Sequence, residues 1–345
     1  MSTVLVTGSS GFLGQLMVQG LLDRGLDCLG IDLQPCDLHH PRFHFLQGDI
    51  RSENDLSRVF SKARIDAVMH VAAVLAHDQS DSNFLWTSNV DGTRKVAEFC
   101  RRFHVPKLVF TSSNCLWGES LHRPVVEEDT PNPAELYGRS KWEGEKVLLE
   151  FSNDLAPIII RCPTILEAGR LGLLSILFEF INEGRRVWVV GDGTNRYQFI
   201  YALDLIEAMV QSLKLERASV FGIGSDDPKP LETVYRYVIE KAGSTSRIAH
   251  FPKTLALPAM KLAYKAGVSP LGPYHYKMIA EEFCFDTTKI KQHLAWRPTL
   301  TNEEMLLRAY QYYRENRADI HSRRSASAHR KPASMGVIRL LKWVS

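Results

Sequence analysis

Three glycines near the start of the chain constrain the fold most. Gly8, Gly11 and Gly14 follow the apolar run of residues 4–7 and open a segment, residues 12–24, whose apolar side chains recur at helical spacing. A strand that ends in such a turn and continues into a helix lets the backbone approach a pyrophosphate, which the N–H groups of the helix start then bind. The spacing is G-x-x-G-x-x-G and not the more familiar G-x-G-x-x-G. The turn therefore predicts a dinucleotide site.

Strand-like and helical segments alternate through the first half of the chain. Helical patterns separate apolar runs at residues 28–31, 43–46, 67–71, 107–111 and 158–160. This alternation predicts crossover connections and hence an α/β fold, a parallel sheet with helices on both faces. The runs are continuously apolar, as expected of strands that are buried on both sides.

The pattern changes after about residue 165. The sequence now predicts helices over residues 171–183 and 201–214 and a strand over residues 186–190. We expect three parts. Residues 1–165 form the first domain, residues 166–316 form a smaller, helix-rich lobe with segments that return to the first domain, and residues 317–345 form a basic, amphipathic end.

Composition excludes several classes of protein. The chain has 345 residues, of which 45% are hydrophobic and 23% charged, so it is neither disordered nor collagen-like. Its six cysteines form no C-x-x-C pair, which argues against a redox motif, a zinc knuckle or any other metal site, and we expect reduced thiols in the cytoplasm. No signal peptide precedes the first strand, and no apolar stretch approaches the ~20 residues of a membrane span.

The positive charge is concentrated at the C-terminal end. Residues 317–345 hold seven Lys or Arg and one acid, so their net charge is +6. Because the whole chain has a net charge of +3, residues 1–316 have a net charge of 3 − 6 = −3. An acidic body argues against nucleic-acid binding. Residues 318–336 have the composition of a mobile linker, and residues 336–345 would form an amphipathic helix. This end either lies peripherally on a membrane or docks on its own fold or a partner subunit.

An acid at the end of the second strand specifies the dinucleotide. The Asp32 carboxylate is placed to accept hydrogen bonds from the adenosine ribose hydroxyls. It would repel a 2′-phosphate, and no arginine is placed to bind one, so the sequence favours NAD over NADP. After the next strand-like run, Asp49 and Ile50 are placed to contact the adenine.

A tyrosine and a lysine form the predicted catalytic pair. Tyr137 and Lys141 are four residues apart, so on a helix they share one face. A free phenol has a pKa near 10 and is a poor base, but a neighbouring ammonium favours the phenolate. Tyr137 is therefore a candidate acid/base for a hydroxyl or carbonyl. Ser113, at the end of the strand over residues 107–111, would hydrogen-bond the same substrate oxygen.

In this order, the motifs resemble the extended short-chain dehydrogenase/reductase superfamily, in its NAD-dependent epimerase/dehydratase group. The matching segments are residues 7–14, 32, 49–50, 70–73, 89–93, 111–113, 137–141 and 161–163. The resemblance implies a Rossmann-type, doubly wound domain, bound NAD, a homodimer, and hydride transfer at a secondary alcohol or its ketone. Tyr137 would be the acid/base, Lys141 would bind the nicotinamide ribose, and Ser113 would orient the reacting oxygen. The remaining cofactor contacts it implies are Gly8, Gly11, Phe12, Leu13, Gly14, Asp32, Asp49, Ile50, Val71, Ala72, Ala73, Asn89 and Cys162.

Departures from this resemblance bear on the substrate. Nucleotide-sugar members resemble G-x-G-x-x-x-R-D-F in the lobe, whereas Tyr197 and Gln198 stand here in place of the Arg-Asp pair, and Arg196 is one position off. A diphosphate site without that arginine loses bidentate contacts. The apolar region 255–278, interrupted by Pro258, Pro270 and Pro273, would either cover the substrate or form the lobe core.

The pattern is closest to the 3β-hydroxysteroid-dehydrogenase-like branch, which implies an apolar, sterol- or lipid-like substrate. The alternatives are a nucleotide-sugar 4-epimerase with tightly bound NAD and a non-catalytic NAD-binding scaffold. The intact Ser113, Tyr137 and Lys141 argue against the scaffold. Two side chains stay ambiguous: His70 is interpreted as a core histidine, and Trp117 packs either on substrate or on the lobe.

Overall fold

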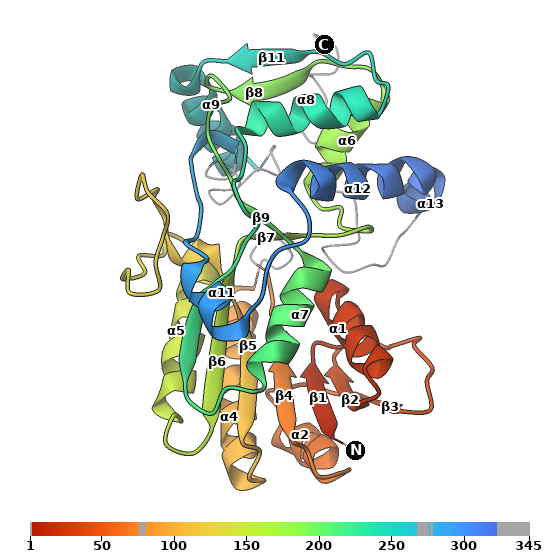
Figure 1. Ribbon diagram of the computed structural model, residues 1–345, viewed down its shortest axis with the longest axis vertical. Coiled ribbons are helices and arrows are strands. Elements are labelled where there is room, and N and C mark those ends of the chain that lie inside the picture. The colour runs from red at the N-terminus through yellow and green to blue at the C-terminus, as the bar shows by residue number, and fades with distance from the viewer. Residues whose placement is uncertain (1, 76–80, 268–275, 277–278, 323–345) are drawn as a thin grey trace.

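A seven-stranded parallel sheet forms the centre of the computed structural model, which describes residues 2–75, 81–267, 276 and 279–322 (Figure 1). The strand order is β10-β6-β5-β4-β1-β2-β3. These strands are β1 (Thr3–Thr7), β2 (Asp27–Asp32), β3 (Phe43–Gln47), β4 (Ala67–His70), β5 (Lys107–Ser113), β6 (Ala156–Cys162) and β10 (Ser219–Gly222). The order reverses between β1 and β4, where doubly wound sheets bind ligands at the carboxyl ends of their strands. The predicted α/β, Rossmann-type fold is confirmed.

Helices cover both faces of this sheet. One face carries α1 (Phe12–Asp23), α7 (Ala202–Ser212) and α11 (Thr288–Leu294), and the other carries α2 (Glu53–Phe60), α4 (Gly92–Arg102) and α5 (Leu136–Glu150). Successive side chains of a strand point to opposite faces, so Val4 and Val6 of β1 enter the first core and Leu5 enters the second. Between β4 and α4 lie α3 (Ser82–Trp86) and the π-helical turn η1 (Thr87–Asp91).

The C-terminal lobe stands above the carboxyl ends of the strands (Figure 1). It contains α6 (Leu174–Asn182), α8 (Leu231–Lys241), α9 (Lys253–Lys265), α12 (Asn302–Glu315) and α13 (Arg317–Ser322). Two short parallel pairs complete it: β8 (Val187–Val190) with β11 (Ile248–Phe251), and β7 (Thr164–Leu166) with β9 (Phe199–Tyr201). Strand β10 and helices α7 and α11 pack with the central sheet, although all three follow residue 166. The exact domain boundaries at residues 165 and 316 stay a prediction.

Helix α9 differs from the expectation in two respects. Pro258 was expected to interrupt the segment, yet it lies inside α9, and the helix continues through it. The helix was expected to cover the substrate or to lie in the core of the lobe, but Ala256 is its one buried residue among those described, and Leu255 and Leu262 are exposed. The interruption at Pro258 and the lobe-core interpretation were wrong, because apolar composition alone does not say what packs against a helix. That this segment covers the substrate stays a prediction. Pro270 and Pro273 lie outside the described residues.

The start of the predicted C-terminal linker also differs from the expectation. Residues 317–322 form α13, in which Ile320 is fully buried in the lobe core. Arg317 pairs with Glu179 of α6 at 2.6 Å, so an apolar contact and an ion pair hold this segment in place of the mobile linker expected from residue 318. The amphipathic segment 336–345 lies outside the described residues.

No helix in the described ranges is both long and apolar enough to cross a bilayer.

Candidate active site

The glycine turn joins β1 to α1 at the switch point. Gly8 has φ +73°, in the left-handed region that favours glycine, and a Cβ atom there would lie 2.7 Å from the Cα of Ala72, which follows β4. A Cβ on Gly14 would lie only 1.9 Å from the Gly8 carbonyl oxygen. The turn is therefore packed so closely, against itself and against Ala72, that side chains are excluded at both positions.

Gly11 is the N-cap of α1, and Phe12 and Leu13 form its first turn. Among the described side chains, none caps this helix, and its first turn holds no acidic residue. The positive end of the helix dipole is thus open to an anion. The structure brings the predicted pyrophosphate-binding residues together at one place.

Asp32 lies beside this turn at the end of β2. Its carboxylate accepts hydrogen bonds of 2.9 Å from the backbone N–H groups of Ser10 and Gln34. Burial raises the pKa of the Asp32 carboxyl, and these hydrogen bonds oppose the rise. The backbone therefore fixes the side chain beside the glycine turn. Its contact with a ribose stays a prediction.

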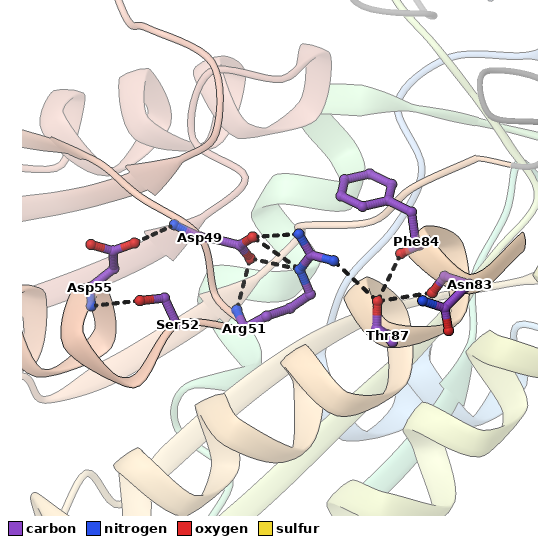
Figure 2. A network of polar contacts seen from close by, with 7 residues as sticks. All are labelled: Asp49, Arg51, Ser52, Asp55, Asn83, Phe84 and Thr87. Atoms are coloured by element: carbon purple, nitrogen blue, oxygen red, sulfur yellow. Dashed lines mark hydrogen bonds and ion pairs between the residues drawn. The ribbon is translucent and has the colours of Figure 1, made fainter. Parts of the chain in front are cut away.

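Asp49 belongs to a network of polar contacts around Arg51 (Figure 2). Arg51 binds the Asp49 carboxylate through Nε and Nη2, at 2.9 and 2.6 Å, and donates through Nη1 to the Thr87 hydroxyl at 3.1 Å. Burial raises the pKa of Asp49, but the hydrogen bonds and charge of Arg51 outweigh it, so the net shift is downward. Ile50 is buried in the sheet core. Their contact with adenine stays a prediction.

Ser113 and Tyr137 meet across the site. Ser113 ends β5 and Tyr137 lies in the first turn of α5, where the Ser113 side chain is close enough to lower the pKa of the Tyr137 phenol. A Cβ on Gly138 would lie 2.2 Å from the carbonyl oxygen of Cys115, so the glycine after the tyrosine lets α5 approach the segment that follows β5. The structure thus unites the predicted acid/base with the predicted orienting hydroxyl.

Lys141 is buried one turn after Tyr137 on α5, and its Nζ atom lies 3.9 Å from the centroid of the Phe110 ring. Burial lowers the pKa of Lys141 to about 8. Burial also raises the pKa of the Tyr137 phenol, whereas Arg170 and the Ser113 hydrogen bond lower it. The net shift of the Tyr137 pKa in the chain alone is therefore upward, whereas we expected Lys141 to lower it. Loss of hydration outweighs the lowering by Arg170 and Ser113.

His70 is the centre of a buried hydrogen-bonded chain. Its Nδ1 lies 2.6 Å from the Thr7 hydroxyl, and its Nε2 lies 2.9 Å from the Thr93 hydroxyl. Thr93 in turn donates to the carbonyl of Asn89 at 2.7 Å, so it accepts from Nε2–H, and Thr7 donates to Nδ1. Burial lowers the pKa of His70 to about 3, which keeps the ring neutral. His70 is a core histidine, as interpreted, next to Val71, Ala72 and Ala73 of the predicted cofactor wall.

Asn89 connects that wall to the catalytic helix. Its amide pairs with both the N–H and the carbonyl of Val74, at 2.8 and 3.0 Å, and donates to the Ser140 hydroxyl at 3.0 Å. The Ser140 hydroxyl also donates to the carbonyl of Tyr137 at 2.8 Å. The predicted supporting role of Asn89 therefore has a geometric basis.

Beneath the site lies a buried ion pair that the sequence did not reveal. Glu145, one turn after Lys141, accepts from Nη2 of Arg161 on β6 at 2.8 Å and from the Ser112 hydroxyl at 2.5 Å. Beside it, the buried Cys162 thiol contacts the carbonyl of Ser112 at 3.3 Å, and burial raises its pKa to about 12. In the sequence, Glu145 lies four residues after Lys141, and this spacing could have indicated that Glu145 shares the helix face of the site.

Arg170 was also missed. This half-buried residue follows β7, and its guanidinium carbon lies 5.9 Å from the ring centroid of Phe12, the first residue of α1. Its charge acts on the Tyr137 phenol. Arg170 thus stands between the glycine turn and the acid/base, a position set by a loop that no local pattern could place.

Aromatic side chains close the side of the site that faces the lobe. The Tyr197 hydroxyl accepts from Nδ2 of Asn114, next to Ser113, at 2.6 Å. Trp117 is buried against Phe283 and Phe285, with ring centroids 6.1 and 5.7 Å away. Of the two interpretations of Trp117, the structure supports packing on the lobe.

In the described ranges, no group of three or more His, Cys, Asp or Glu is placed to hold a metal ion.

Comparison with known proteins identifies the family. Residues 4–224, which include the glycine turn and the Ser113, Tyr137 and Lys141 constellation, match the NAD dependent epimerase/dehydratase family. The chain belongs to this family. It is an NAD-dependent enzyme of the extended short-chain dehydrogenase/reductase type, with features of the 3β-hydroxysteroid-dehydrogenase-like branch. The closed glycine turn and uncapped α1 fit the pyrophosphate of that cofactor.

Relatives in the family differ in what they are named for. The chain is 34% identical to the uncharacterized protein y4nG of Sinorhizobium fredii, over 99% of this chain and 86% of that protein. It is 26% identical to a mouse sterol-4-alpha-carboxylate 3-dehydrogenase, decarboxylating, over 91% of both chains. The fold is shared with a UDP-glucose 4-epimerase from Thermotoga maritima, solved with UDP-glucose: the TM-score is 0.75 at 22% identity, over 91% of this chain and 99% of that one.

Proposed function

We propose that this enzyme transfers hydride at a secondary alcohol or its ketone in an apolar, sterol- or lipid-like substrate. The observation that carries the proposal is the set of contacts made by Tyr197 and Gln198, which stand in place of the Arg-Asp pair. Tyr197 is bound to Asn114, and the buried Gln198 binds the backbone of Ser225 and Phe285 at 2.7 and 2.8 Å. Both side chains are used internally and offer no cation to a diphosphate.

Charges around the neighbouring cavity support the same conclusion. A cavity of about 310 Å³ lies beside Gln198, and the arginines that line it are Arg123 and Arg196. Arg123 is paired with Asp129 at 2.6 Å, and Arg196 lies 3.8 Å from Asp227. The lining also includes the carboxylates of Asp226, Asp227 and Glu282. A diphosphate here would meet several acids and two cations already in ion pairs, which disfavours a nucleotide sugar.

The residues of this chain would divide the work as follows. Bound NAD supplies the acceptor or donor of the hydride. Tyr137 takes the proton of the substrate hydroxyl, or returns it to the ketone oxygen, and Ser113 holds that oxygen by a hydrogen bond. Lys141 supplies positive charge behind the tyrosine. The aromatic wall around Trp117, Phe283 and Phe285 excludes water from the lobe side.

A nucleotide-sugar 4-epimerase is the second candidate, because a UDP-glucose 4-epimerase of Lacticaseibacillus casei is 28% identical over 65% of this chain. Arg196 is half exposed in the same lobe segment and would be its diphosphate contact. This reaction interconverts sugars without net formation of NADH, so the two candidates give different products.

The test assays the purified chain with NAD against 3β-hydroxysterols, other lipid alcohols and UDP-sugars, and measures NADH by absorbance and sugar products by chromatography. We expect NADH from a lipid alcohol. Interconversion of a UDP-sugar without NADH would establish the second candidate and overturn the first.

Two variants separate catalysis from scaffolding. Tyr137→Phe removes the acid/base and should lower kcat by roughly 10²–10⁴-fold. Tyr235→Phe removes a hydroxyl on α8, away from the site, and should leave kcat unchanged. No turnover of any substrate, with the same NAD binding in both variants, would favour the non-catalytic scaffold.

A further inference from the structure

Helix α9 presents an apolar line to solvent at the far end of the lobe from the sheet (Figure 1). Leu255 is 62% exposed and Leu262 is 71% exposed, and the two lie seven residues apart on one side of the helix. Pro258, also exposed, lies between them on that side. Ala256 packs inward, and the inward-facing Met260 accepts a 3.0 Å hydrogen bond from the Tyr276 hydroxyl at its carbonyl. The helix is thus anchored on one side and bare on the other.

The charges on α9 all have one sign. Lys253, Lys261 and Lys265 are exposed, and residues 253–265 contain no Asp or Glu. Lys261 and Lys265 are one turn apart and flank the line formed by Leu255, Pro258 and Leu262, here called the α9 face. A helix with exposed apolar residues bordered by lysines has the character of an interfacial helix, whose lysine stems extend toward anionic headgroups.

We propose that the α9 face binds the interfacial region of a bilayer that contains anionic lipids. The leucines would enter the boundary between headgroups and acyl chains, and the lysines would pair with lipid phosphates. This inference goes beyond the proposed reaction and does not rest on it, because lipid binding is measured without substrate.

Charge favours a bilayer over a second copy of this chain. Two α9 faces in contact would bring together four lysines, Lys261 and Lys265 of each copy, with no acid from either helix, and like charges at an interface are repulsive. An anionic membrane provides the opposite charge and an apolar layer at once. Glu232 of α8, an acid in the same lobe, is already paired with Arg236 and with His250.

The test measures cosedimentation of the full chain with vesicles of phosphatidylcholine, with and without phosphatidylglycerol. We expect binding to the anionic vesicles that weakens as salt is added. Because each leucine buried in the interface is worth about tenfold in partitioning, Leu255→Ser with Leu262→Ser should weaken binding roughly a hundredfold. Lys261→Glu with Lys265→Glu should abolish the preference for phosphatidylglycerol.

A matched control replaces two leucines that are exposed elsewhere. Leu149→Ser with Leu203→Ser, at 36% and 43% exposure, should leave vesicle binding unchanged. Residues 323–345 are present in every variant, so any contribution they make is common to all. Equal binding by the Leu255/Leu262 variant and the parent would overturn the proposal. So would a variant that only loses self-association in sedimentation velocity, because the α9 face would then bind a second copy.

Discussion

The Ser112 hydroxyl donates a 2.5 Å hydrogen bond to Oε1 of Glu145, and so joins the end of β5 to the middle of the catalytic helix. Ser112 precedes Ser113, and Glu145 follows Lys141 by one turn. Arg161 on β6 neutralises the carboxylate from the other side at 2.8 Å. One buried carboxylate therefore fixes the relative positions of the elements that carry all three predicted catalytic residues.

Replacing this carboxylate should destabilise the protein. Glu145→Gln keeps the shape of the side chain but leaves the buried Arg161 without its counter-charge, so the free energy of unfolding should fall by about 3–5 kcal/mol. Urea unfolding measures the change. Glu150→Gln, which breaks the exposed pair with Arg94 at the end of the same helix, is the control and should leave stability nearly unchanged. Equal effects of the two variants would show that the buried pair has no special structural role.

Lys141 should make stability rise with pH above about 8. Burial lowers its pKa from 10.5 to about 8, so between these values the unfolded chain holds a proton that the folded chain has released. Stability therefore increases as pH rises, by about 2 kcal/mol between pH 8 and 10 from this residue alone. The measurement is the difference between the parent and Lys141→Met in urea unfolding at each pH, which cancels the cysteines and tyrosines. Parallel curves of unfolding free energy against pH for the parent and Lys141→Met would contradict this prediction.

His70 should make stability depend on pH in the same direction, but in the acid range. Its folded pKa is about 3 against an ordinary 6.5, so the unfolded chain binds a proton below pH 6.5 that the folded chain excludes. Stability should fall by about 2 kcal/mol between pH 6.5 and 5 through this residue. His70→Gln should lack this loss, whereas His39→Gln, in an exposed loop, should retain it. If the free energy of unfolding of the parent falls no more than that of His70→Gln between pH 6.5 and 5, the imidazole is protonated in the folded protein.

Local patterns made the fold and the centre of the site predictable. Gly8, Gly11 and Gly14 lie within seven residues, and Tyr137 and Lys141 within five, so their relation is set by one turn and one helix. The contact of Tyr197 with Asn114 joins residues 83 apart, and it depends on how the lobe docks on the sheet. Helix α9 was misjudged for the same reason: its apolar sequence predicted burial, and only its neighbours decide exposure.

Gly14→Ala should abolish NAD binding. The new methyl group would start 1.9 Å from the Gly8 carbonyl oxygen, so either the turn or the start of α1 must move. Titration of NAD by protein fluorescence measures the loss. The control is Gly20→Ala on the same helix, where the nearest atom is a methyl group of Ile206 at 3.0 Å, in a flexible side chain away from the turn. Retained NAD affinity in Gly14→Ala would remove the glycine turn from the cofactor site.

Arg170 should set the pH at which Tyr137 becomes active. Burial raises the pKa of the phenol, and Arg170 is the nearby cation that opposes this rise in the chain itself. Arg170→Met should therefore move the limb on which kcat for alcohol oxidation rises with pH to higher pH, and lower the rate at neutral pH. Arg170→Lys keeps the charge and should restore most of the parent profile.

Only an electrostatic role predicts this difference between Met and Lys. The guanidinium also packs near the ring of Phe12, so a purely structural role would lower NAD affinity in both variants and leave the shape of the pH profile unchanged. The decisive measurement is the kcat profile at saturating NAD, where weakened cofactor binding no longer contributes. A profile for Arg170→Met that coincides with that of the parent would assign Arg170 to packing, and the pKa of Tyr137 would then depend on Lys141 and the bound cofactor.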